Sequence, residues 1–443
     1  MYSGKLKTAT YQFFILLAVL TISGGLQARE YVIQPEHNNA QSVIDKAADG
    51  DTVHFTSGIH KENLNVHKSL IITGESGTIL DGGNQGDVLR VHAPNVTVRD
   101  LHIRYSGHNL TKMNAGIFVE KSAENILVEN NTFYANGFGI WLNKAVKPRI
   151  LNNKIHAKPE VRSQDRGNGI HLSGTTHGII KANEVWDTRD GIYIENSQHN
   201  ILEKNILHDL RYGIHYMYSY SNRVIENHTY NTRTGYALMQ SKYLTVLNNT
   251  SSHDRNYGML LNFITHSTLA NNRIQKVKEG AGYVTGGSAI LGAEGKAVFI
   301  YNSQFNKIHD NLFAHSDIGI HLTAGSEDNQ VYGNAFINNR VQVKYVATRQ
   351  QDWSHEGRGN YWSDYLGWDL DADGIGDKQY EPNDAVDKLL WKYPMSRILM
   401  SSPAIETLRW VQEQFPVLRP QGVRDSAPMM QSPFTLQTKE TSS

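Results

Sequence analysis

The chain of 443 residues contains no cysteine. This absence excludes a disulfide scaffold, a thiolate metal site and a cysteine nucleophile. It also suits an oxidising compartment, where free thiols would pair. Nor is there an excess of charge, since 43 Lys and Arg residues balance 43 Asp and Glu residues. No basic stripe is therefore indicated, and we expect no nucleic-acid partner.

Long apolar runs are also missing, except near the N-terminus. Lys5 and Lys7 precede an apolar stretch at residues 13–20, and Leu26, Gln27 and Ala28 form an acceptable cleavage site. This pattern predicts a signal peptide over residues 1–28. The alternative is a membrane anchor, but the stretch is shorter than the roughly 20 apolar residues that span a bilayer.

A short motif, glycine followed by apolar residues in alternation, recurs mostly at spacings of 22 or 23 residues. It begins at Gly116, Gly139, Gly169, Gly191, Gly213, Gly235, Gly258 and Gly319, with Ala297 in the same place. Alternation with period two is typical of strands rather than helices. Such short strands bury their apolar face only when coils stack. The repeat therefore predicts an all-β fold, a right-handed parallel β-helix over residues 29–345 with about 22 residues per coil.

Asparagine recurs fourteen residues after each start. The column comprises Asn130, Asn153, Asn183, Asn205, Asn227, Asn249, Asn272 and Asn311, and slips by one residue to Asn334 in the coil that starts at Gly319. Stacked side-chain amides can bond one another and satisfy the backbone of a turn. We therefore expect an asparagine ladder along one edge of the rod.

The two ends depart from the repeat. Residues 40–48 predict a short capping helix, followed by a first strand at residues 52–55. Two inserts, at residues 155–168 and 278–295, are expected to leave the rod at the same turn. Beyond the β-helix we expect an aromatic and Asp-rich end segment at 346–381 and a tail at 382–443.

The tail is expected to contain one helix. Ser402 can cap it with Pro403 at its first position, which places the helix at about residues 403–415. The tail could lie along a partner or cap the rod, and both alternatives stay open. Trp410 and Phe415 are its candidate partner contacts.

The outward side chains of the glycine strands form an unusual column. Its members are Phe118, Trp141, His171, Tyr193, His215, Ala237, Leu260, Phe299 and His321. A solvent-exposed sheet face is expected to be polar, whereas an exposed apolar column is typical of an interaction site. Trp141 and Tyr193 are candidate partner contacts on it.

A copper site is predicted on the same face. The repeat places Met217 next to Met239 on neighbouring strands, with His215 two residues before Met217. Thioethers and imidazole are soft ligands that suit Cu(I) better than Zn, Mg or Ca. The alternative is that the methionines only pad a partner surface.

Arginines recur two residues before the repeat glycines, at Arg189, Arg211 and Arg233. Asp187 and Asp209 precede two of them and could neutralise them. The column is then a solvated ladder of ion pairs or, alternatively, a site for an anion.

A calcium loop is predicted after the rod. Asp369, Asp371, Asp373 and Asp377 occupy positions 1, 3, 5 and 9 of an oxygen-rich loop with Gly374 at position 6. Position 12 holds Tyr rather than Glu. The alternative is an Asp/Gly turn bonded to itself.

The repeat, the segment GNYWSDYLGWDLDADGIGDKQY at residues 359–380 and the tail SPAIETLRWVQEQFPVLRPQGVRDSAPMM at 402–430 resemble the NosD family. The resemblance covers essentially the whole mature chain. It implies a periplasmic, non-enzymatic protein that helps to mature nitrous oxide reductase and its copper–sulfide centre.

The resemblance also implies partners: an ABC transporter of the membrane subunit NosY and the ATPase NosF, the copper chaperone NosL, and the client reductase NosZ. Copper would be held transiently. His215, Met217 and Met239 are predicted from the column pattern, not from the family.

Two other functions remain open. A polysaccharide lyase or C5-epimerase acts on the same kind of sheet face and could recruit His171, Tyr193, Glu195 and His215. The outward columns carry no paired Asp carboxylates, which argues against it. An adhesion module would need neither metal nor transporter.

Overall fold

The computed structural model describes residues 28–278, 294–347, 349–393, 396, 402–415 and 420–434. The predicted signal peptide lies, apart from Ala28, outside these residues. So does nearly all of the insert at 278–295. In the described part of the chain, no helix is long and apolar enough to cross a membrane.

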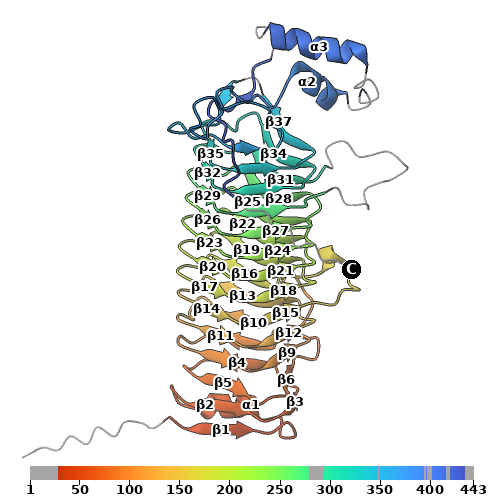
Figure 1. Ribbon diagram of the computed structural model, residues 1–443. Coiled ribbons are helices and arrows are strands. Elements are labelled where there is room, and N and C mark those ends of the chain that lie inside the picture. The colour runs from red at the N-terminus through yellow and green to blue at the C-terminus, as the bar shows by residue number, and fades with distance from the viewer. Residues whose placement is uncertain are drawn as a thin grey trace, which may run out of the picture.

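The chain winds into a rod of three parallel sheets, A, B and C, and each full coil adds one strand to each sheet in turn (Figure 1). Sheet C holds β4 Leu64–Val66, β7 Leu89–Val91, β10 Ala115–Val119, β13 Phe138–Asn143, β16 Ile170–Ser173, β19 Asp190–Glu195, β22 Tyr212–Met217, β25 Thr234–Met239, β28 Tyr257–Asn262, β31 Lys296–Tyr301, β34 Ile318–Thr323 and β37 Val341–Val346. The predicted parallel β-helix is confirmed.

The other two sheets are built from shorter strands. Sheet A holds β1 Glu30–Ile33, β2 Thr52–Phe55, β5 Ile71–Gly74, β8 Thr97–Arg99, β11 Leu127–Glu129, β14 Arg149–Leu151, β17 Ile179–Lys181, β20 Ile201–Glu203, β23 Arg223–Ile225, β26 Thr245–Leu247, β29 Thr268–Ala270, β32 Lys307–His309 and β35 Gln330–Tyr332. Sheet B holds β3 Gly58–His60, β6 Thr78–Asp81, β9 His102–Arg104, β12 Thr132–Tyr134, β15 Lys154–His156, β18 Glu184–Trp186, β21 Ile206–His208, β24 His228–Tyr230, β27 Thr250–Ser252, β30 Arg273–Gln275, β33 Leu312–Ala314, β36 Ala335–Ile337 and β39 Tyr361–Trp362.

The apolar alternation places one side chain in two inside the rod. In β19, Ile192 and Ile194 are fully buried and belong to the continuous core that runs the length of the solenoid. Their counterparts in the next coil, Ile214 and Tyr216, pair with them in register. Each coil therefore buries its apolar face against the coils on either side.

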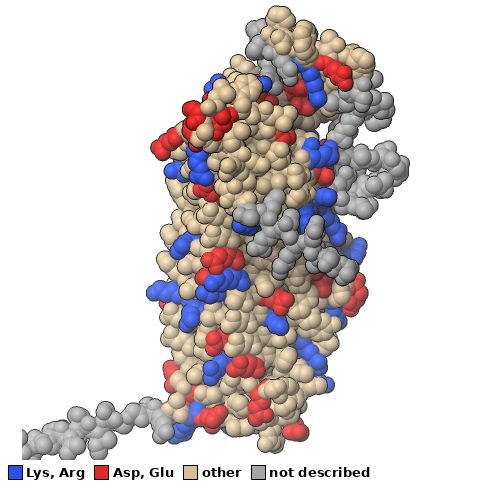
Figure 2. Space-filling model, viewed as in Figure 1, with Lys and Arg blue, Asp and Glu red and all other residues tan. Residues whose placement is uncertain are grey.

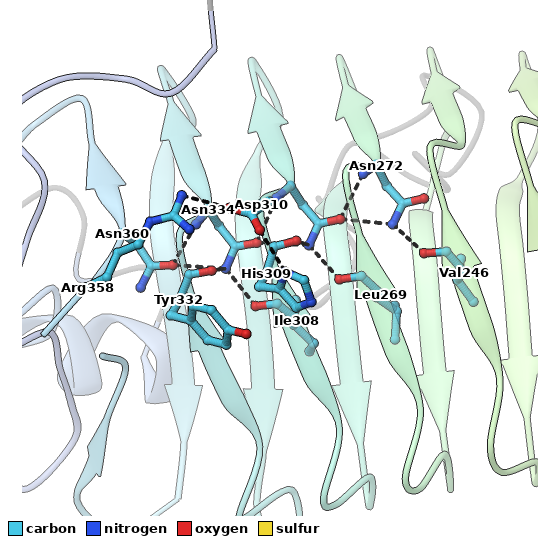
Figure 3. A network of polar contacts seen from close by, with 11 residues as sticks. Val246, Leu269, Asn272, Ile308, His309, Asp310, Tyr332, Asn334, Arg358 and Asn360 are labelled. Atoms are coloured by element: carbon cyan, nitrogen blue, oxygen red, sulfur yellow. Dashed lines mark hydrogen bonds and ion pairs between the residues drawn. The ribbon is translucent and has the colours of Figure 1, made fainter. Parts of the chain in front are cut away.

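The asparagine ladder runs along the turn between sheets A and B (Figure 3). Asn272 donates from Nδ2 to Asn311 Oδ1 at 2.9 Å, and Asn311 repeats the bond to Asn334 at 2.9 Å. Each amide also bonds a backbone carbonyl of a preceding coil, as Asn272 does with Val246 at 3.0 Å. The turn backbone is thereby satisfied without water.

The prediction that Asn130 belongs to the ladder is wrong. Asn131, not Asn130, bonds Asn153, because Asn130 occupies the turn position with φ of 57°. The slip at Asn334 keeps that residue within the ladder, and the ladder continues to Asn360.

The N-terminal end is capped by α1 Ala40–Lys46, whose Ala40 and Ile44 are buried in the core. The expected first strand at residues 52–55 is the second. Glu30–Ile33 forms β1 and pairs with it in parallel, so the rod begins one strand earlier than the sequence pattern indicated.

The C-terminal tail closes the other end of the rod. β40 Val423–Arg424 pairs with β38 Gln351–Asp352, and Val423 joins Trp353 and Trp362 in the core. The tail could lie along a partner or cap the rod. Residues 420–430 cap the rod.

Two helices project beyond this cap (Figure 1). α2 Ala385–Lys392 is followed by α3 Pro403–Gln414. The helix α3 lies where the sequence predicts one, but the expectation of a single helix in the tail is wrong, because α2 also lies in it. Ser402 occupies the N-cap position of α3, but its side chain makes no capping hydrogen bond. Arg409 of α3 lies 3.1 Å from Asp384, the N-cap of α2, and ties the two helices together.

Candidate functional site

The outward column of sheet C has the predicted register, and we call it the outer row. Tyr193 pairs with His171 on one side and His215 on the other, and His215 pairs with Ala237. Met217 pairs with Met239 on adjacent strands. Side chains at such paired positions lie roughly 5 Å apart.

The expectation that the outer row is exposed is wrong for several members. Trp141 and His215 are each 8% exposed, and His171 is 6% exposed. The rings contact one another across coils: Trp141 and His171 stack with centroids 3.7 Å apart, and Tyr193 and His215 meet edge to face at 4.5 Å. Trp141 is thus mostly covered, which weakens its candidacy as a partner contact.

In several coils an aromatic residue directly before the repeat glycine covers the row from one side. Phe138 packs its edge against Trp141 at 4.8 Å, and Tyr212 packs against His215 at 4.9 Å. The sequence carries this signal, because the position before the glycine is aromatic in several coils.

Asp190 also occupies a position before a repeat glycine, and it meets His215 of the next coil. Its Oδ2 lies 2.9 Å from His215 Nδ1, and Arg211 approaches both carboxylate oxygens, at 2.8 Å and 2.6 Å. Burial by itself would raise the pKa of Asp190. The hydrogen bonds from His215 and Arg211 outweigh it and lower that pKa, so the carboxylate is charged at neutral pH.

A second buried histidine lies two coils earlier. His171 Nε2 is 3.4 Å from Glu195 Oε1, and Glu195 also accepts from Ser173 Oγ at 2.9 Å. The hydrogen bond from His171 is the main cause of the lowered pKa of Glu195, while burial lowers the pKa of His171. Between the two histidines, burial raises the pKa of Tyr193 to about 12.

The predicted copper ligands are brought to one place. His215, Met217 and Met239 share the outer face of β22 and β25, and the small Ala237 lies beside His215. Since Asp190 engages Nδ1, Nε2 is the ring nitrogen that can bind a metal ion. A carboxylate on the remaining ring nitrogen is the usual partner of a metal-binding histidine. This donor set fits a soft cation such as Cu(I).

The last histidine of the row, His321, has an environment that the sequence did not indicate. Both ring nitrogens are buried without a hydrogen-bond partner. Burial, Lys344 and Lys296 together lower its pKa to about 3. His321 lines a cavity of about 800 Å³ that Trp391 of α2 also borders.

The Asp-rich loop brings three of its four predicted ligands together. Carboxylate oxygens of Asp369, Asp371 and Asp373 lie within 4.8 Å of one another. Asp377 Oδ2 accepts from the backbone N–H of Leu370 at 2.7 Å, which braces the loop. Repulsion from Asp373 is the main cause of the raised pKa of Asp371. A bound cation would relieve this repulsion.

The tail candidates lie on the projecting helices. Trp410 is 58% exposed on α3 and Phe415 is 56% exposed at its end. Two large apolar side chains in solvent are consistent with a contact surface.

Comparison with known families agrees with this architecture. Residues 151–367 match the family described as "Periplasmic copper-binding protein (NosD)", and residues 54–173 match a right-handed β-helix region. Two relatives are each named "Probable ABC transporter binding protein NosD". The one from Pseudomonas aeruginosa is 58% identical over 87% of this chain and 90% of its own. The one from Stutzerimonas stutzeri is 53% identical over 85% and 86%.

Solved structures share the fold at low identity. The A-module of the mannuronan C-5 epimerase AlgE6 from Azotobacter vinelandii superposes with a TM-score of 0.56, at 15% identity over 73% of this chain and 93% of its own. The Streptococcus pneumoniae surface adhesin PfbA gives 0.52, at 11% identity over 69% and 89%. An epimerase and an adhesin on one scaffold carry no functional conclusion. The identity to the two named relatives does decide the family: this chain belongs to the NosD family.

Proposed function

We propose that this protein is a periplasmic copper platform for the maturation of nitrous oxide reductase and its copper–sulfide centre. In this proposal NosL supplies copper as Cu(I), the protein holds it transiently, and NosZ receives it. NosY and NosF form the ABC transporter on which the protein is held. The family description and the relatives' names support the copper and transporter parts of this role.

The contact between Asp190 and His215 carries the copper part of the proposal. A charged carboxylate on Nδ1 fixes the ring tautomer and leaves Nε2 as the nitrogen available to a metal ion. Met217 and Met239 then supply two thioethers from adjacent coils. Partial burial of both methionines limits competition from water for a weakly hydrated ion.

A Cu(I) titration against a colorimetric Cu(I) chelator tests the site. Met217→Ala with Met239→Ala is expected to weaken Cu(I) binding at least tenfold while the far-UV circular dichroism stays unchanged. Met430→Ala is the matched control, because Met430 lies in the C-terminal cap away from the outer row. Equal Cu(I) affinity and stoichiometry in the double variant and the control would overturn the assignment.

The transporter part of the proposal rests on the projecting helices. α3 presents Trp410 and is followed at once by Phe415, and both side chains are exposed. We propose that this surface binds NosY. Co-purification with the NosY–NosF complex tests it: Trp410→Ser with Phe415→Ser is expected to lose the complex, and Tyr243→Ser, an exposed aromatic on the rod, to keep it. Retention by the double variant would count against the surface.

We further propose that the Asp369 loop binds calcium in a structural role. Three converging carboxylates, a glycine at φ of 87° and a raised pKa at Asp371 support it. The alternative of a self-bonded turn is partly realised, since Asp369 and Asp373 also accept backbone N–H groups of the loop.

The rival function, a uronate lyase or epimerase, has weaker support. Tyr193, His215, Asp190 and Arg211 do cluster as acid–base residues would. However, a pKa of about 12 makes Tyr193 a poor base. His171 and His215 are also covered by neighbouring rings, which leaves little room for a sugar chain above them.

A further inference from the structure

A groove of about 520 Å³ lies along the turn that leads from sheet B to sheet C. Five arginines line it: Arg166, Arg189, Arg211, Arg233 and Arg255. Four of them occupy equivalent positions in four consecutive coils. With about 4.8 Å per coil, the run extends over roughly 14 Å.

The groove keeps an excess of positive charge, because five arginines line it against two carboxylates, those of Asp187 and Asp209. Asp187 and Asp209, which the sequence suggested as partners, also line the groove but form no ion pair with these arginines. Asp209 instead lies 2.7 Å from His208 Nδ1. Arg211 is paired, but with Asp190.

Among the described residues, Arg189, Arg233 and Arg255 make no ion pair. Arg189 Nε is in addition buried without a hydrogen-bond acceptor. A buried guanidinium nitrogen without an acceptor is costly. An anion in the groove would supply the missing acceptor, so of the two readings of the arginine column the anion site is favoured over the ladder of ion pairs.

One wall of the groove is formed by the first insert, which contributes Ser163, Gln164 and Arg166 to the lining. The first insert leaves the rod between β15 and β16, at this same turn, and contains η1 Ser163–Asp165. Arg166 pins the insert by donating to the backbone carbonyls of Val161, Pro159 and Asp187, each at 2.5–2.6 Å. Ser163 is thereby held at the rim.

The length of the run identifies the class of anion. One oxyanion cannot contact all four guanidinium groups of a run that extends over roughly 14 Å, so the run suits a ligand with several negative charges. Carboxylates match the guanidinium fork in pairs. Among the described residues that line the groove, Leu210 is the apolar one and none is aromatic, so a sugar ring has nothing on which to stack.

We propose that the arginine groove is a docking site for a segment of a partner protein that carries several Asp or Glu carboxylates. The groove adjoins the outer row, because Asp190 bonds both Arg211 and His215. A segment docked there brings its protein next to the copper ligands. The inference does not depend on copper binding.

Fluorescence anisotropy with a fluorescein-labelled octaglutamate peptide tests the docking site. Arg189→Gln with Arg233→Gln is expected to weaken binding at least tenfold, and wild-type affinity to fall steeply with salt. Arg233→Gln with Arg255→Gln, both at exposed positions, is a second variant that spares the half-buried Arg189 and is expected to act likewise. Arg149→Gln with Arg223→Gln, exposed on sheet A, removes the same charge elsewhere and is expected to change affinity less than twofold.

Three results would overturn the proposal. One is equal weakening by groove and control variants, which would indicate general charge attraction. Another is that inorganic phosphate displaces the peptide as well as unlabelled octaglutamate does, which would indicate a single-oxyanion site. The third is that trimannuronate binds in the groove more tightly than the peptide, which would assign it to a polysaccharide.

Discussion

The carboxylate of Asp425 terminates the asparagine ladder at Asn360. Its Oδ2 accepts the Asn360 backbone N–H at 2.7 Å and the Trp362 indole N–H at 2.8 Å. A residue of the C-terminal tail thus takes the place that the next coil would supply, and the open end of the solenoid is closed. Burial raises the pKa of Asp425 to about 6.

Removal of this cap is expected to destabilise the rod. Asp425→Ala leaves the buried N–H donors of Asn360, Trp362 and Ala427 without this acceptor, and each such loss costs about 1–3 kcal/mol. We expect a loss of about 2–5 kcal/mol in the free energy of unfolding, measured by urea denaturation with tryptophan fluorescence. Asp352→Ala, which breaks a more exposed ion pair with Arg424 on the adjoining strand, is the control and is expected to cost under about 1 kcal/mol. Similar losses in both variants would refute the capping role.

Asp254 is expected to make stability depend on pH. It is fully buried inside the rod, where it accepts from Thr232 Oγ1 at 2.7 Å, and burial raises its pKa to about 7. Because the unfolded chain releases this proton near pH 4, the stabilising contribution is complete below that pH. It is lost as pH rises to about 7.

The corresponding measurement is the urea midpoint at pH 5 and pH 8. Wild type is expected to be less stable at the higher pH, by up to about 2.7 kcal/mol from this group, since pH 5 lies two units below a pKa of about 7. Asp254→Asn should flatten the dependence, whereas Asp45→Asn, at an exposed position of α1, should leave it unchanged. A slope that survives Asp254→Asn would assign the effect to other groups.

The Asp190 carboxylate is expected to control copper affinity through His215. Asp190→Asn removes the charge that fixes the imidazole and is expected to weaken Cu(I) binding about 10–100-fold. Arg211→Gln leaves the carboxylate on His215 and should weaken it far less. Competition with a Cu(I) chelator measures both, and ¹⁵N chemical shifts of the His215 ring report its tautomer. Identical behaviour of the two variants would exclude a specific role for Asp190.

Calcium is expected to stabilise the C-terminal end. Millimolar Ca²⁺ should raise the melting temperature by a few degrees, because it binds the folded loop and not the unfolded chain. EDTA should reverse the shift, and Mg²⁺ should act more weakly because it prefers octahedral geometry with several waters. In Asp371→Asn with Asp373→Asn the shift should vanish. An unchanged shift in that variant would place the ion elsewhere.

Most of the fold could be predicted from the sequence because the repeat is local and regular. A glycine every 22 or 23 residues defines both the strand and its register. The pairing of Met217 with Met239 therefore followed from counting alone. Where the spacing is perturbed, as at Asn130 and Asn131, the count failed by one residue.

The cover of the outer row, the partner of His215 and the cap at Asn360 could not be predicted, because they depend on contacts that the repeat does not specify. The outer row was expected to be exposed because alternation assigns a face but does not show what lies above it. Phe138 and Tyr212 cover that face from the first positions of β13 and β22, directly before the glycine of the repeat. Asp190 was missed as the partner of His215 for the same reason. Asp425 lies 65 residues from Asn360 with no period to connect them.

The stacking of coils also sets the distance between sites along the rod. His215 stands on β22, and five strand steps of sheet C separate it from β37, next to the helices that project from the end. At about 4.8 Å per step this amounts to roughly 24 Å. Insertion or loss of repeats changes this distance only in steps of one whole coil, about 4.8 Å each. The distance between any two sites on the rod is therefore set by the number of repeats that lie between them.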